Sequence, residues 1–161
     1  MNGVASWIAN AEEQSEYLCV DALEHWLAPE ALHFWERRPA DGIVMGRDVP
    51  SRAIARLLNR VIVYEPIDDH RDLKVRLAGA AVRRRFDRDI TGLKMSELFG
   101  PAEFPIRFRT TMAAIEQNEP RMVHIVHGTR DIETLRLELL ILPALAPHGG
   151  DRWALVFCFY F

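Results

Sequence analysis

Two segments near the C-terminal end of the chain predict strands that are apolar on both sides. The segments 134–142 and 153–161 alternate with a period of two, as strands do. One side of the first segment carries Leu135, Leu137, Leu139 and Ile141, and the other side ends in Leu140 and Leu142. An antiparallel sheet usually leaves one of its faces in water. A chain with these strands must therefore cover both faces of its sheet.

The order of the remaining elements predicts the fold class. The segments 61–64, 73–77 and 122–126 also predict strands, because they are rich in β-branched residues or alternate with a period of two. Short helices are expected over 51–58 and 80–86, and a longer one over 102–118. This order predicts an α+β fold, in which a five-stranded antiparallel sheet has its helices on one face.

An N-terminal helical extension is expected before this domain. The spacing of apolar residues over 15–27 predicts an amphipathic helix, and Pro29 suits the first turn of a second helix. The turn-rich segment 39–50 predicts a linker. We therefore expect residues 1–50 to form the extension and linker, and residues 51–161 to form the domain. The helix 15–27, or a second protomer, would cover the second face of the sheet through Leu23, Trp26 and Leu27.

Composition excludes several classes of protein. Of the 161 residues, 49% are hydrophobic and 27% are charged, which is typical of a globular domain. No apolar run reaches the roughly 20 residues of a membrane span, and no secretory leader is evident, so we expect a cytoplasmic protein. Cys19 and Cys158 do not form a CxxC motif, so no disulfide framework is expected. The net charge of −3 argues against nucleic acid as a partner, despite the arginines over 83–88.

The middle of the chain resembles a PAS sensor domain. The strand Leu73–Gly79, a short helix and then Asp89–Leu98, with Thr91-Gly92 at its turn, are similar to the central signature of that family. The similarity covers about residues 51–161, and the Trp-bearing segment 31–35 resembles the helical extension of stand-alone alphaproteobacterial members. The resemblance implies a non-enzymatic module of bacterial signal transduction. Such a module forms a homodimer or docks on another signalling protein.

The same resemblance implies a small molecule, or none, between the sheet and the helices. Haem-binding PAS domains use a histidine on the long helix, and the segment 102–118 contains none. Flavin-binding light sensors use an Asn-Cys-Arg motif, which is absent. Haem and flavin are thus disfavoured, and we expect no cofactor or a small apolar ligand.

The expected ligand-binding residues come from several elements. They are Arg76, Phe86, Met95, Met112, His124 and Trp153. Arg76 alternates with apolar neighbours on a strand expected to be central, so its guanidinium needs a partner. The alternatives are Glu138 across the sheet, an acidic ligand, or a carboxylate of a partner protein.

Other constellations favour structural interpretations. His124 and His127 lie three apart on a strand and should point to opposite faces, so no metal site is expected. No hydrolase, protease or nucleotide-binding motif occurs, so no catalytic residue is assigned. One alternative function remains, a small cone-shaped α+β enzyme. In that enzyme His124 would converge with an acid, either Asp131 or Glu138, in a pocket of a curved sheet.

Overall fold

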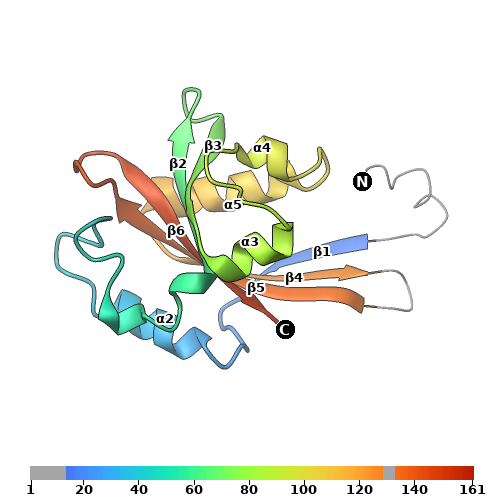
Figure 1. The fold of residues 1–161 in the computed structure, drawn as a ribbon, viewed down its shortest axis with the longest axis horizontal. Coiled ribbons are helices and arrows are strands. Elements are labelled where there is room, and N and C mark those ends of the chain that lie inside the picture. The colour runs from blue at the N-terminus through green and yellow to red at the C-terminus, as the bar shows by residue number, and fades with distance from the viewer. Residues whose placement is uncertain (1–13, 129–132) are drawn as a thin grey trace.

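The computed structural model describes residues 14–128 and 133–161. Its centre, within those residues, is a six-stranded sheet with the strand order β1-β4-β5-β6-β2-β3 (Figure 1). The strands are β1 (Gln14–Cys19), β2 (Val61–Ile67), β3 (Asp72–Ala78), β4 (Arg121–Gly128), β5 (Glu133–Leu145) and β6 (Arg152–Tyr160). The helices are α2 (Ala28–Glu36), α3 (Ala80–Phe86), α4 (Met95–Leu98) and α5 (Phe104–Gln117), with 3-10 turns at η1 (Arg52–Ile54) and η2 (Leu58–Arg60).

Every pair of neighbouring strands in this sheet is antiparallel. The last three strands form the predicted meander, because β4 pairs with β5 and β5 pairs with β6. The hairpin of β2 and β3 joins the sheet through β6. The expected α+β class is confirmed, and the five predicted strands are all present. The sixth strand, β1, was not predicted.

One face of the sheet packs against α3, α4 and α5 (Figure 1). The side chains between them form the first core, which includes Val75, Ile90, Met95, Met112, Ile125, Leu139, Val156 and Cys158. The αL conformation of Asn118, at φ 54°, ends the long helix α5. Gly92 has φ 90°, so it makes the tight turn that its position before α4 predicted. This turn lets the chain close α4 over the sheet.

The opposite face of the sheet carries a second core. Its sheet residues include Leu140, Leu142, Leu155, Phe157 and Phe159, and all five are buried. Residues between 27 and 57 cover them, among them Leu27, Ala28, Ala31, Ile43, Met45, Val49, Ile54 and Leu57. The second face is therefore covered by the preceding segment of the same chain, as the two-sided apolar strands required.

The helix predicted over 15–27 is wrong. Residues 14–19 form β1, the edge strand that pairs with β4 in the register Tyr17↔Ile125. Alternation explains the outcome, because Tyr17 packs on the first core while Leu18 points to the other face and is 48% exposed. The following residues are irregular up to Ala28, where α2 begins. Pairing with β4 thus outweighs the helical spacing of the apolar residues.

The linker expected over 39–50 is packed into the domain. Ile43, Met45 and Val49 are buried in the second core. The backbone N–H of Met45 donates to the carbonyl oxygen of Leu145 at 2.9 Å, which fastens this segment to the end of β5. The helix expected over 51–58 consists of the two 3-10 turns η1 and η2. The division of the chain at residue 50 stays a prediction.

Candidate functional site

A cleft of about 410 Å³ opens on the first face of the sheet. This cleft is lined by Ile62, Arg84, Arg85, Phe86, Leu98, Phe99, Glu103, Arg107, His127, Leu135, Leu137, Leu139, Cys158 and Tyr160. The lining comes from α3, α4, the start of α5 and the strands beneath them, so the cleft lies between the helices and the sheet. Its volume falls within the range of about 300–1,000 Å³ that small-molecule sites occupy.

A smaller cavity of about 20 Å³ adjoins the cleft and shares Ile62, Arg107, Leu139 and Cys158 with it. It reaches Tyr17 on β1 and Met95 on α4. A cavity needs about 10–15 Å³ to hold one water molecule. The inner cavity therefore has room for a water but not for an organic ligand, and of these two adjoining spaces the cleft is the one large enough for such a ligand.

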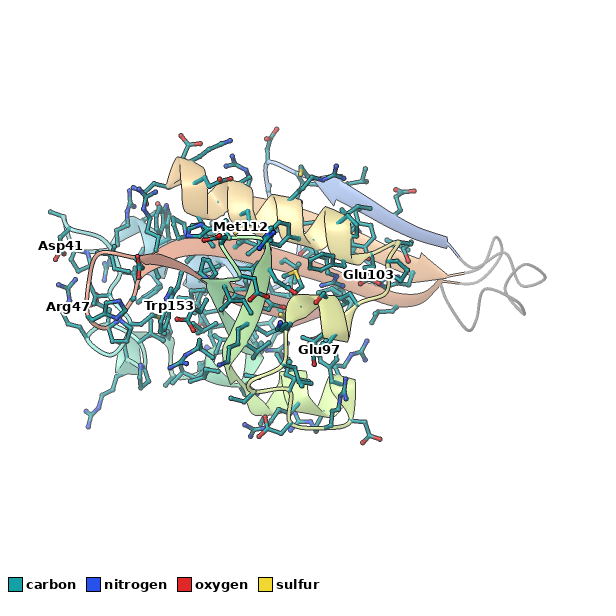
Figure 2. The ribbon with its side chains drawn as sticks, turned by 90° about the horizontal axis from the view of Figure 1, so that it is seen from above. Asp41, Arg47, Glu97, Glu103, Met112 and Trp153 are labelled. Carbon is teal, nitrogen blue, oxygen red and sulfur yellow. The ribbon has the colours of Figure 1, made fainter. Side chains whose placement is uncertain are left out.

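An ion pair stands between the cleft and the inner cavity. Arg107 Nε donates to Glu103 Oε2 at 2.6 Å, and the two side chains are 12% and 24% exposed. Burial opposes the charge of Arg107 most strongly, but Glu103 together with Tyr17 and Tyr64 favours that charge, and the net effect is a raised pKa of the guanidinium. The Cζ atom of Arg107 lies 4.1 Å from the ring centroid of Phe99. Figure 2 shows Glu103 just before α5, at the end of that helix nearer to α4. The pair therefore holds the Arg107 guanidinium in place at the cleft wall.

Several other polar groups of this region are buried. The Tyr17 hydroxyl is enclosed and has no hydrogen-bond partner within 14–128 and 133–161, and burial raises its pKa above the usual range. Burial likewise raises the pKa of the Cys158 thiol to about 12. The thiolate is the nucleophilic form of cysteine. Cys158 is thus a protonated lining residue at neutral pH and not a nucleophile.

The second face of the sheet is left partly bare beyond α2. Trp26 is 69% exposed and Phe161 is 53% exposed, although most large apolar side chains of the described segments are covered. His25 lies between them, with its ring centroid 6.0 Å from that of Trp26 and 5.2 Å from that of Phe161. Leu18 lies on the same face, opposite His124 in the β1–β4 register. We call Leu18, Glu24, His25, Trp26, Arg136 and Phe161 the docking patch.

Glu138 fastens the docking patch to the sheet. Its carboxylate is 1% exposed and accepts the backbone N–H of Glu24 at 2.9 Å and that of His25 at 2.8 Å. His124 Nδ1 lies 3.3 Å from Glu138 Oε2, and Glu24 Oε2 lies 2.9 Å from Arg136 Nη2. A buried carboxylate is stable only when its lone pairs are taken by donors. Glu138 therefore acts as a clasp that holds residues 24 and 25 on β5.

Three of these groups could also contact a cation. Glu24, His124 and Glu138 offer ligand atoms that all lie within 4.8 Å of one another. However, Arg136 already pairs with the Glu24 carboxylate, and backbone N–H groups occupy both oxygens of Glu138. A cation would have to displace these donors. The donor arrangement fits the clasp better than it fits a metal site.

The structure separates the predicted ligand-binding residues. Phe86 lines the cleft, Met95 lines the inner cavity, and Met112 is buried in the same first core. Trp153 belongs to the second core, on the opposite face of the sheet from these three residues. Figure 2 shows Met112 on α5 and Trp153 on a strand.

Arg76 and His124 also lie outside the cleft. Arg76 Nη1 is 3.6 Å from Glu65 Oε1, and its Cζ is 5.4 Å from the ring centroid of Trp153. The expected pair of Arg76 with Glu138 is thus wrong. β3 is an edge strand, which leaves Arg76 exposed with a partner on the adjacent β2.

The predicted interface residues have different environments. Leu27 is buried in the second core, and Leu23 packs against its margin. Trp26 alone of the three is mainly exposed. His124 and His127 point to opposite faces as predicted, since His124 contacts Glu138 whereas His127 lines the cleft and hydrogen-bonds Ser15. Asp131, one candidate acid for the enzyme alternative, lies outside the described residues.

Sequence reasoning missed the Glu103–Arg107 pair and the Glu138 clasp. The first had a detectable signal, because an acid four residues before an arginine on a helix marks an ion pair. The second had none, since the backbone donors of Glu24 and His25 lie 114 and 113 residues from Glu138 in the sequence.

A comparison with protein families matches the PAS domain over residues 25–156. The match spans most of the chain and includes α2 and most residues of both cores and of the cleft. The chain therefore belongs to the PAS domain family, a class of sensory and interaction modules. No curated protein matches the chain. Within the described residues, no helix combines the length and apolar character needed to cross a bilayer.

Proposed function

We propose that this PAS domain is a non-enzymatic sensor of bacterial signal transduction that acts as a homodimer and holds a small apolar ligand in its cleft. The docking patch is the observation that supports dimerisation. It exposes Trp26 and Phe161 beside a pair of opposite charges, Glu24 and Arg136. In a twofold dimer the same patch meets itself, so that each Glu24 can face the partner's copy of Arg136.

The strands offer a physical connection between the cleft and the docking patch. On β5, Leu137 and Leu139 line the cleft while Arg136 and Glu138 belong to the opposite face. On β6, Tyr160 lines the cleft, and Phe161 follows it in the patch. A ligand that displaces β5 or β6 would therefore also change the positions of the side chains in the docking patch. Signalling would then consist of altered association with a second copy or with another signalling protein.

Light scattering of the purified chain tests the dimer. The double substitution Trp26→Asp and Phe161→Asp places like charges in the patch, so we expect the dimeric wild type to become monomeric, with at least a tenfold weaker association. The single substitution Leu77→Asp is the control, because Leu77 is 41% exposed on the edge strand β3, at the other end of the sheet. A strictly monomeric wild type, or a double variant that stays dimeric, would contradict the proposal.

A second candidate function, the small enzyme, is favoured by one observation. His124 and Glu138 do converge, with Nδ1 and Oε2 3.3 Å apart. Its weakness is that Glu138 already serves as the clasp for residues 24 and 25. NMR titration of the six histidines distinguishes the functions. A general base in this pair would respond to Glu138→Gln with a shifted titration and lost turnover, whereas a clasp would respond with faster amide exchange at residues 24 and 25.

A further inference from the structure

We propose that the ligand of the cleft is an amphipathic carboxylate, a short alkyl chain that ends in one negative charge. This inference rests on the proposed ligand-holding function and names the chemical class that the cleft would select. The evidence is the distribution of charge on the cleft wall. Three arginines, Arg84, Arg85 and Arg107, line the cleft, and only one acid, Glu103, lines it with them.

The three arginines differ in their availability. Arg107 is neutralised by Glu103 at 2.6 Å. Arg84 and Arg85 are exposed at the mouth on α3, and neither forms an ion pair with another described residue. Arg85 instead lies over the ring of Tyr160, with Cζ 4.6 Å from the ring centroid. The mouth of the cleft therefore carries two guanidinium groups with free donors.

The interior of the cleft is apolar by contrast. Its walls include Phe86, Leu98, Phe99, Leu135, Leu137 and Leu139. A neutral hydrocarbon would fill the space between these walls but would leave the guanidinium groups of Arg84 and Arg85 without an anion to pair with. A cationic amphiphile would meet like charge at the mouth. Only an anionic head on an apolar tail satisfies both parts, because a guanidinium group pairs with carboxylate through two parallel hydrogen bonds.

Calorimetric titration with three probes of equal chain length tests the class. The probes are octanoate, 1-octanol and octyltrimethylammonium, each below its micelle concentration. We expect octanoate to bind about tenfold more tightly than octanol, as two partly exposed ion pairs allow. The advantage should shrink as salt is raised, because salt screens exposed charges. Octyltrimethylammonium should bind most weakly.

Substitutions inside and outside the cleft show which residues produce the preference for octanoate. Arg84→Gln with Arg85→Gln should remove the tenfold preference for octanoate and leave octanol binding unchanged. The matched control is Arg88→Gln with Arg109→Gln, which removes the same charge from two exposed arginines that do not line the cleft. Leu135→Trp narrows the cleft and should weaken both probes.

The outcomes separate this inference from the function on which it rests. If octanoate and octanol bound equally tightly and Leu135→Trp weakened both, the proposed carboxylate group of the ligand would be contradicted and the proposed apolar ligand would be supported. Binding that the control variant weakens as much as the Arg84 and Arg85 variant would also overturn it. No binding of any probe would overturn both the carboxylate and the ligand-holding half of the proposed function, while the dimer would still be decided by light scattering.

Discussion

His25 is the residue whose protonation state is fixed most clearly by its surroundings. Its Nδ1 accepts the backbone N–H of Leu27 at 3.1 Å, and its Nε2 lies 3.2 Å from the carbonyl oxygen of Tyr160. A carbonyl can only accept, so the proton must be on Nε2 and the ring must be neutral. Burial, with the charge of Arg60 adding to it, lowers the pKa of His25 below its ordinary value of 6.5.

This lowered pKa predicts a loss of stability in mild acid. The unfolded chain takes up a proton at His25 near pH 6.5, but the folded chain takes it up only at lower pH. The contribution of neutral His25 to stability is therefore complete above pH 6.5 and declines as the pH falls below it. Urea denaturation between pH 5 and pH 7.5 should show this decline in the wild type and a smaller one in His25→Phe.

The exposed His33 provides the control for this prediction. His33→Phe should leave the pH dependence as it is in the wild type. If the His25→Phe curve had the same slope as the wild type, the assignment of a neutral His25 would be wrong.

Among the secondary-structure elements, the turn between β3 and α3 packs very closely against η2. A Cβ atom at Gly79 would lie 2.4 Å from the backbone carbonyl carbon and oxygen of Asn59 in η2. The backbone N–H of Gly79 also donates to the carbonyl oxygen of Val61 at 2.8 Å. The backbone is fixed on both sides of this contact. A side chain at this position must therefore push η2 away from α3.

Gly79→Ala should lower the free energy of unfolding by about 3 kcal/mol, at the upper end of the usual cost of overpacking. Gly150→Ala is the comparison, because Gly150 has φ 87° and open space around it. That change should cost only about 1–2 kcal/mol of backbone strain. Thermal denaturation of the two variants measures both costs. A Gly79→Ala protein as stable as Gly150→Ala would show that η2 and α3 are not in contact.

The observed helices and strands show which elements could be predicted from the sequence. β-branched composition and alternation of apolar residues identified the strands β2 to β6, and α3 and α5 lie where helices were expected, because these elements carry their signal in their own residues. β1 was misread as a helix, since an edge strand depends on its partner β4 rather than on its own residues. β2 also continues through Pro66, where the strand has no partner on the β6 side, so the missing N–H costs no ladder bond.

At the scale of the whole molecule, one sheet separates two cores with different roles. The two-sided strands predicted a covered second face, and the sequence placed the cover in the N-terminal extension, but on a helix over 15–27 and not on residues 27–57. Residues 39–50 have no apolar periodicity, and Ile43, Met45 and Val49 become buried only through contacts with the sheet, about a hundred residues away in the sequence. The cleft on one face and the docking patch on the other could not be predicted for the same reason. Both are assembled from distant segments.

A single sheet separates the cleft from the docking patch, and this arrangement is the one that the proposed function requires. The first core is incomplete beside α3, where the cleft opens, and the second face is incomplete beyond α2, where the docking patch lies. Both openings adjoin β5 and β6. A ligand and a partner can therefore act on the same two strands without touching each other.

We propose that a second copy of the chain covers the docking patch, and a dilution series followed by NMR of the ¹⁵N-labelled protein can detect that contact at single residues. If the dimer forms through the docking patch, the indole N–H signal of Trp26 and the amide signal of Phe161 will shift with protein concentration, while the amide signal of Leu77 will not shift. Signals at Trp26 and Phe161 that do not change with concentration, or changes confined to the β3 edge, would contradict it.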